Sequence, residues 1–173
     1  MLLYWIWLAE HPELTPPQKT FLAAHFSDPE ELYFGEHTED LDPQIQKALE
    51  NKDLEEAKRV LRKCAQKQID VLTLADQEYP HRLRNIVDPP LVLYYKGTLP
   101  DFSARPLIAM VGTRKATPYG VNAARTLARQ ISACGGLIVS GGAEGIDTAA
   151  MQGALDRDDP VVCVLGCGVD ESL

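Results

Sequence analysis

The stretch from residue 107 to residue 170 constrains the fold of this chain more than any other, because short apolar segments alternate there with helical ones. Residues 107–111, 137–140 and 160–165 are apolar runs of strand length, as expected for strands buried on both faces. A loop rich in small residues follows each run. This alternation predicts a parallel α/β unit with its loops beyond the carboxyl ends of the strands.

Local signals predict where the two intervening helices begin and end. Thr117 and Pro118 are an N-cap residue and a proline at the first helical position. The glycine pair 135–136 is typical of the left-handed position that ends a helix. The second helix is expected over about residues 147–155, with Asp147 as its capping residue.

The loops between these elements have the composition of phosphate-binding loops. Helix N-termini there present free N–H groups and a positive dipole end, and glycines let an anion approach the backbone. Arg114 adds a permanent charge suited to bidentate contact with phosphate. The alternative, that the glycines only form tight turns, stays open. The candidate phosphate-binding residues are Gly112, Thr113, Arg114, Lys115, Gly141, Gly142 and Gly145.

Other binding and catalytic chemistries find little support in the sequence. A G-x-G-x-x-G fingerprint and a G-x-x-x-x-G-K-[ST] loop are both absent, so no cofactor is expected. All four histidines precede residue 82, outside the glycine-rich stretch, which argues against a catalytic triad and against an enzyme. The four cysteines form no C-x-x-C pair, so we expect reduced, buried thiols and no metal site.

The net charge of −8 is unevenly distributed along the chain. Residues 1–104 hold 11 basic and 18 acidic side chains, whereas residues 105–173 hold 6 and 7. The acidic N-terminal part is therefore not expected to be the main nucleic-acid surface. In the C-terminal part, the local charge around five basic residues matters more for nucleic-acid binding than the net charge of the whole chain. These residues are Arg105, Arg114, Lys115, Arg125 and Arg129.

Residues 1–68 are predicted to form a small bundle of short helices. The turn at residues 11–17 contains prolines and no glycine, so it lacks the backbone donors of a DNA-binding helical hairpin. We therefore interpret the bundle as structural or protein-binding, with Trp5, Trp7 and Phe21 in its core. Helices are expected over residues 2–10, 17–26 and 31–34, and from Pro43 and Asp53 onward.

The segment after the bundle is predicted to enter the α/β domain. Residues 69–74 and 91–96 are strand-like and are expected to join or flank the parallel sheet. The predicted domains are thus a helical domain over 1–68 and an α/β domain over 69–173. The apolar start lacks the basic residues of a signal peptide, and no run approaches the roughly 18–20 apolar residues of a membrane span. A cytoplasmic location is expected.

Several motifs, in register along the chain, resemble the DNA-processing protein A family, also called DprA or Smf. The segments VGTRKATPYG, VSGGAEGIDTAA and VLGCGVD are similar to the core of that family. LTLADQEYPHRLRNI and DPPLVLYYKG are similar to its upstream part, and LLYWIWLAEHP to its helical start. The resemblance covers nearly the whole chain. It implies an α/β fold with a SAM-like helical bundle followed by an incomplete Rossmann-like parallel sheet.

The resemblance also implies a function. Family members are cytoplasmic bacterial proteins that bind single-stranded DNA without catalysis. They protect incoming strands during natural transformation (competence) and help to load the RecA recombinase. Carried over by position, the candidate residues of the first loop would form one wall of the DNA pocket, and those of the second loop the other.

Three features depart from the family pattern. Glu144 stands where the family has a basic residue, and a carboxylate there repels phosphate. Met151 stands where the family tends to have histidine. The family's domain continues beyond the third strand, and its dimerisation and RecA contacts are associated with that further part. The resemblance therefore implies impaired DNA loading and no secure homodimer for these residues.

Two alternative functions stay open. SGGAEGIDTAAM also resembles the first glycine motif of the LOG family, whose members cleave the base from nucleoside monophosphates, so one alternative is such a hydrolase or a nucleotide-binding protein. Those hydrolases need a later P-G-G-x-G-T-x-x-E motif, which this sequence lacks. The other alternative is a remnant that binds nothing, or a domain whose exposed sheet edge needs a partner chain.

Overall fold

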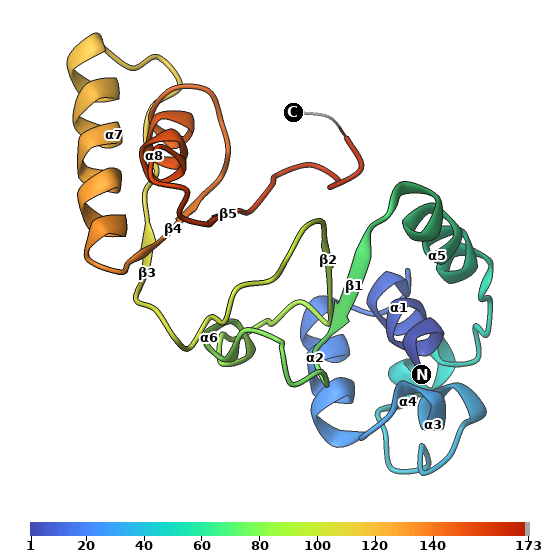
Figure 1. Ribbon diagram of the computed structural model, residues 1–173. Helices are drawn as coiled ribbons and strands as arrows, with labels where there is room; N and C mark the ends of the chain where they lie inside the picture. The colour runs from blue at the N-terminus through green and yellow to red at the C-terminus, as the bar shows by residue number, and fades with distance from the viewer. Residues whose placement is uncertain (172–173) are drawn as a thin grey trace. The chain divides into compact units, whose positions relative to one another are not determined.

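The computed structural model describes residues 1–171, which divide into two compact units, Met1–Gly97 and a second unit that begins at Thr98 (Figure 1). The first unit ends later than the helical domain that the sequence predicts. The physical reason is that Leu91 and Val92 are buried in the hydrophobic core of the helical bundle. The segment that follows the bundle therefore completes the first unit.

Short helices with local capping make up most of the first unit. The carboxylates of Asp28 and Asp42 accept the N–H groups of Glu30 and Gln44 at 2.9 and 2.8 Å, and a proline follows each aspartate. The helices are α1 (Leu2–Glu10), α2 (Pro16–His25), α3 (Pro29–Phe34), α4 (Pro43–Ala48), α5 (Glu55–Lys67) and the single turn α6 (His81–Arg84). The first three lie within two residues of their predicted bounds.

Two strands of the first unit, β1 (Asp70–Thr73) and β2 (Val92–Tyr95), pair with each other in an antiparallel sheet of their own. Of the two placements expected for these segments, joining the parallel sheet is wrong. Val92 and Tyr94 alternate onto one face of β2, and Val71 lies opposite Tyr94. All three pack against the helical core, which holds the pair in the first unit.

Helix α1 lies at the centre of the first unit because its apolar residues continue around the helix. Trp5, Ile6, Trp7 and Leu8 are each less than 5% exposed. The helix packs against α3, α5 and β2. The prediction that both tryptophans are core residues is confirmed, whereas it is wrong for Phe21, which is 42% exposed.

The second unit is the predicted α/β unit. Its three parallel strands lie in the order β3-β4-β5, with Ile138 opposite both Ile108 and Val161. The predicted α/β, Rossmann-like parallel sheet is confirmed, although the two outer strands are shorter than predicted. The elements in chain order are β3 (Leu107–Ala109), α7 (Pro118–Ala133), β4 (Leu137–Ser140), α8 (Ile146–Leu155) and β5 (Val161–Cys163).

The ends of α7 follow the local signals in the sequence. The hydroxyl oxygen of Thr117 accepts the Gly120 N–H at 3.2 Å, which confirms Thr117 as the N-cap. Gly135, just beyond the helix, has a φ of +86°, as expected for a left-handed terminating residue. The prediction that Asp147 caps α8 is wrong, because α8 begins one residue earlier and its N-cap position is Gly145.

Helices α7 and α8 lie side by side against the sheet (Figure 1). Ala128 of α7, Ile138 of β4 and Ala150 of α8 form the centre of the hydrophobic core between them. The helices approach closely at Gly153, where an added Cβ would overlap the backbone carbonyl of Arg125. Small residues at this crossing therefore set the distance between the two helices.

None of the four cysteines, all within the described residues, forms a disulfide, and of the four Cys64 alone is buried. Cys163 is half-buried, while Cys134 and Cys167 are exposed, so the expectation of buried thiols is wrong for those two. Within residues 1–171, no helix combines the length and the apolar character that crossing a bilayer requires. The same residues contain no group of three His, Cys, Asp or Glu side chains able to hold a metal ion.

Candidate functional site

The loops that follow β3 and β4 meet at the carboxyl edge of the parallel sheet. The N–H of Ile146 donates to the carbonyl of Thr113 at 3.2 Å. Gly145 has a φ of +96°, and a Cβ there would overlap the carbonyl oxygens of Thr113 and Arg114. A glycine is therefore required at residue 145, and the predicted residues of the two loops are brought together.

Asp147 joins the two loops through its carboxylate. Its side chain is 5% exposed, and Oδ1 accepts the N–H of Gly112 at 3.0 Å while Oδ2 accepts the N–H of Gly141 at 3.1 Å. A carboxylate that accepts two backbone N–H groups makes charge-assisted hydrogen bonds. Two of the N–H groups expected to face a ligand are thus already used inside the protein.

The negative charge of Asp147 also acts on Cys163, at the end of the third strand. Burial first, and then the negative charge of Asp147, raise the pKa of the Cys163 thiol above its ordinary value. Cys163 is the last residue of β5, and the N–H of Val164 beyond it donates to Ser140 at 2.8 Å. The buried carboxylate therefore lies close to the carboxyl ends of all three strands.

The predicted cations of the first loop are available to a ligand. Gly112, Thr113, Arg114 and Lys115 are all exposed. Neither Arg114 nor Lys115 forms an ion pair with any residue that the structure describes. The backbone N–H of Lys115 donates to the Thr113 hydroxyl at 3.1 Å, which holds the loop in a tight turn. The first loop thus presents two free positive charges.

The second loop presents backbone donors rather than charge. Gly141, Gly142 and Gly145 are half-buried, and Gly142 has a φ of +70°. Over the described residues 1–171, no hydrogen bond uses the N–H groups from residue 142 to residue 145. Consecutive unused N–H groups at the start of a helix form an anion-binding concavity. Glu144 is exposed in the same loop, so its carboxylate opposes an anion there.

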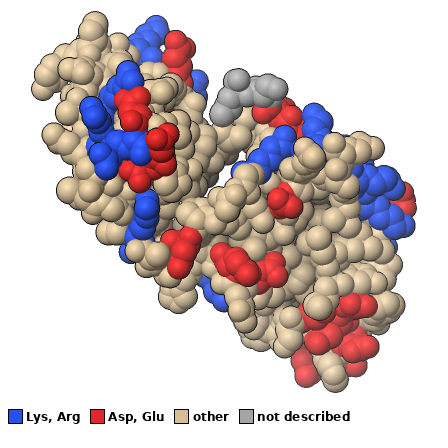
Figure 2. Space-filling model, in the orientation of Figure 1, with Lys and Arg blue, Asp and Glu red and all other residues tan. Residues whose placement is uncertain are grey.

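Two of the five basic residues predicted to set the local charge are neutralised. Arg105 lies 3.7 Å from Asp159, and Arg125 donates to both oxygens of Asp156 at 2.6 and 2.7 Å. The hydrogen bond from Arg125 holds the pKa of Asp156 below its ordinary value. Figure 2 shows basic and acidic side chains interleaved on the visible face of this unit.

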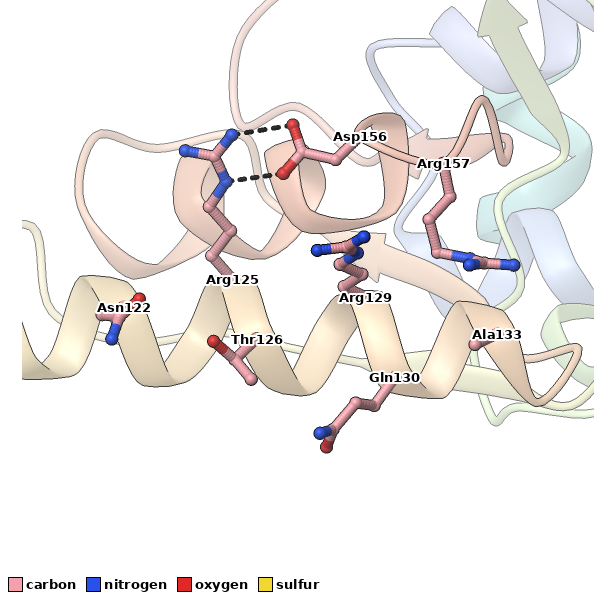
Figure 3. Close-up of a pocket in the computed structure, with 8 residues that line it drawn as sticks. All are labelled: Asn122, Arg125, Thr126, Arg129, Gln130, Ala133, Asp156 and Arg157. Carbon is pink, nitrogen blue, oxygen red and sulfur yellow. Dashed lines mark hydrogen bonds and ion pairs between the residues drawn. The ribbon is translucent and has the colours of Figure 1, made fainter.

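A groove of about 550 Å³ lies between α7 and the end of α8, and the Arg125–Asp156 pair is part of its lining (Figure 3). Arg129 projects between these helices without an ion pair within residues 1–171. Arg157 is held by Asp159 at 3.3 Å. The free positive charge of the unit is thus mainly at the carboxyl edge. The groove is lined by Asn122, Arg125, Thr126, Arg129, Gln130, Ala133, Asp156 and Arg157.

The role of Asp147 is the feature of the site that sequence reasoning missed. Its two hydrogen-bond partners lie 35 and 6 residues away along the chain, so no local pattern indicates them. The one available signal is an acidic residue directly after the small-residue loop, and that signal also fits an ordinary helix cap.

The chain is similar to proteins involved in DNA processing. A family model described as DNA recombination-mediator protein A matches residues 70–173. DNA processing protein DprA of Bacillus subtilis (strain 168) is 34% identical over 110 residues, which are 64% of this chain and 37% of that protein. DNA processing protein DprA of Streptococcus pneumoniae (strain ATCC BAA-255 / R6) is 38% identical over 100 residues, covering 57% and 34%.

A solved structure shows the same similarity. The X-ray structure of DNA processing protein A from Streptococcus pneumoniae superposes with a TM-score of 0.62 at 26% identity, covering 92% of this chain and 49% of that one. The chain thus spans about a third of the length of the two curated relatives described above. Because the family model matches more than half of the residues, this chain belongs to the DNA recombination-mediator protein A family.

Proposed function

We propose that this chain binds single-stranded DNA at the carboxyl edge of its parallel sheet, as a non-catalytic protein that processes DNA during natural transformation. The observation that carries the proposal is the pair of exposed cations Arg114 and Lys115 beside the unused N–H groups of residues 142–145. Phosphodiester oxygens are bound by this combination of groups. The names of the relatives, DNA processing protein DprA and Protein Smf, support the same class of ligand.

The proposed binding mode assigns different groups to neighbouring phosphates. Arg114 contacts one phosphate through its guanidinium, and the N–H groups of residues 142–145 hold the oxygens of the next. The N–H groups of Gly112 and Gly141 take no part, because each donates to Asp147. Asp147 shapes the loops, and Glu144 weakens binding by like-charge repulsion.

A fluorescence-anisotropy titration of labelled oligo-dT at low and moderate salt tests this proposal. We expect salt-sensitive binding, weakened in the variant Arg114→Ala. The slope of log K against log salt should fall by about 0.7 for the lost phosphate contact. Arg62→Ala is the matched control, because Arg62 is an exposed arginine of α5 in the other unit. Unchanged affinity of Arg114→Ala at low salt would overturn the binding mode.

The same preparation separates DNA binding from the hydrolase alternative. A nucleoside-monophosphate hydrolase of the LOG type releases free base from AMP. We expect no base release by this chain, since the proposed edge only binds phosphate. Base release that depends on Glu144 would favour the hydrolase instead.

The proposal extends to the partners that the resemblance implies. Bound strands should resist nuclease digestion, and RecA should nucleate faster on strands that carry this protein. Nuclease protection and RecA filament formation measure these two effects separately. Sedimentation equilibrium measures whether the chain forms a homodimer.

A further inference from the structure

Tyr119 is the residue of the second unit whose exposure calls for an explanation. Its side chain is 83% exposed, whereas the other five tyrosines of the chain are buried or half-buried. Within residues 1–171 its ring stacks on no other ring, and its hydroxyl makes no hydrogen bond. An exposed aromatic ring close to other exposed apolar side chains is typical of a binding surface.

The first turn of α7 holds Tyr119 in a fixed position. Pro118 sets the backbone of this turn, and Thr117 closes it by accepting the Gly120 N–H. An added Cβ at Gly120 would lie 3.4 Å from Ile146, so this side of the turn faces the second loop. Tyr119 precedes Gly120 by about 100° around the helix and points to solvent.

Packing on Ile146 also places the turn that carries Tyr119 next to the proposed phosphate site. A Cβ at Gly112 would lie 2.7 Å from the side chain of Ile146, the residue that also faces Gly120. The first loop and the first turn of α7 therefore pack on one side chain. Arg114 and Lys115, both exposed, lie in the loop that leads into this turn.

Exposed apolar side chains also stand at the carboxyl edge. Val111 follows β3 and is 71% exposed, and Val164 follows β5 and is 62% exposed. An inorganic phosphate or a sugar phosphate has no large apolar face that could pack against these side chains. A strand with unpaired bases presents both phosphates and flat apolar faces, and a duplex hides those faces in its stack.

We propose that Tyr119 stacks on an unpaired base of the DNA whose phosphates contact Arg114 and Lys115, and so selects single strands over duplexes. This inference rests on the proposed function. Aromatic rings in single-strand binding proteins act as stacking platforms that tolerate any base, because every base has a flat face. The cations supply attraction to any polyanion, and the ring supplies the preference for unpaired bases.

Titrations with two labelled oligonucleotides test this inference. One is oligo-dT, and the other has the same length and phosphates but abasic sites throughout. Relative to wild type, Tyr119→Ala and Tyr119→Leu should bind oligo-dT about tenfold more weakly, while Tyr119→Phe keeps its affinity. All four proteins should bind the abasic strand equally. Leu127→Ala is the matched control, because Leu127 is an exposed apolar residue further along α7.

A tryptophan at residue 119 gives a second readout. Trp5 and Trp7 are buried in the first unit, so they contribute a constant background. In Tyr119→Trp, oligo-dT should quench the added fluorescence, and the abasic strand should leave it unchanged. Quenching by both strands, or by neither, contradicts stacking.

The outcomes separate the two proposals. If wild type binds oligo-dT and Arg114→Ala weakens binding, but Tyr119→Ala binds as wild type does, the stacking inference is wrong and the proposed function stands. If wild type with the far-ultraviolet circular dichroism of a folded chain binds neither strand, both are wrong. If Tyr119→Ala weakens the binding of both strands equally, the stacking inference is also wrong, because the abasic strand has no bases on which Tyr119 could stack.

Discussion

The carboxylate of Asp147 accepts the backbone N–H of Gly112, 35 residues earlier in the chain, at 3.0 Å. Its second oxygen accepts the N–H of Gly141 at 3.1 Å. One side chain at the start of α8 therefore fixes both loops that the family resemblance assigns to DNA. The loops are held in shape by a negative charge that lies beneath the proposed phosphate site and is already satisfied by two donors.

Removal of this carboxylate should destabilise the second unit. Asp147→Ala leaves two partly buried N–H groups without an acceptor, which costs about 2–3 kcal/mol. Asp147→Asn should cost less, because its amide oxygen still accepts one of the two hydrogens. Hydrogen exchange at Gly112 and Gly141 measures the effect, since both tryptophans lie in the first unit and do not report on this one. Glu144→Gln, an exposed neighbour, is the control; equal exchange rates in all variants would contradict this role.

Substitution of Gly153 by alanine should destabilise the contact between α7 and α8. The added Cβ overlaps the backbone carbonyl of Arg125, so the helices must move apart. Such overpacking costs about 1–3 kcal/mol. Helix propensity alone predicts the opposite sign, because alanine stabilises a helix by about 1 kcal/mol relative to glycine. Thermal unfolding followed by far-ultraviolet circular dichroism decides between them, with Gly166→Ala, where the Cβ meets open space, as the control.

The stability of the first unit should fall in mild acid because of His11. This side chain is 2% exposed, and its ring lies edge-on to Trp7 with 5.3 Å between the ring centroids. Burial, the largest cause, lowers the pKa of His11 below its ordinary value near 6.5. The folded state then binds fewer protons than the unfolded state. The stabilisation is complete above about pH 6.5 and is lost as the pH falls through the folded-state pKa.

Urea unfolding followed by tryptophan fluorescence between pH 5 and pH 8 measures this dependence. In His11→Gln the part due to His11 should disappear, whatever the absolute stability of that variant. His25→Gln is the control, because His25 is exposed. A pH slope identical in wild type and His11→Gln would show that other groups cause it.

Replacement of Glu144 by arginine should strengthen DNA binding. The exposed carboxylate opposes the charges of Arg114 and Lys115 in the proposed site. Glu144→Arg removes that repulsion and adds one cation, so the salt dependence of log K should steepen by about 0.7. Glu144→Gln should give an intermediate affinity and an unchanged slope. Identical binding by the three proteins would show that the second loop does not face DNA.

Elements with local signals were predictable from the sequence alone. Thr117 caps α7, and Gly135 ends it, because each acts on backbone groups within a few residues. Residues 137–140 form β4 as predicted, since an apolar run bounded by glycines suits a central buried strand. Membership of the family was also predictable, because several of its motifs occur in this sequence in the same order.

Contacts between distant residues were not predictable in this way, and only the tertiary structure decided them. Asp147 stands in the sequence where a helix-capping residue is expected, yet its carboxylate accepts N–H groups from two loops. Arg125 is paired with Asp156, which lies 31 residues further along the chain, and no local pattern indicates that pair. The pairing of β1 with β2, too, depends on which apolar surface their side chains meet. The sequence by itself determined most of the elements, the glycine-rich loops and the family. The fold decided which charges and N–H groups stay free for a ligand, because their acceptors are distant in the chain and near only in space.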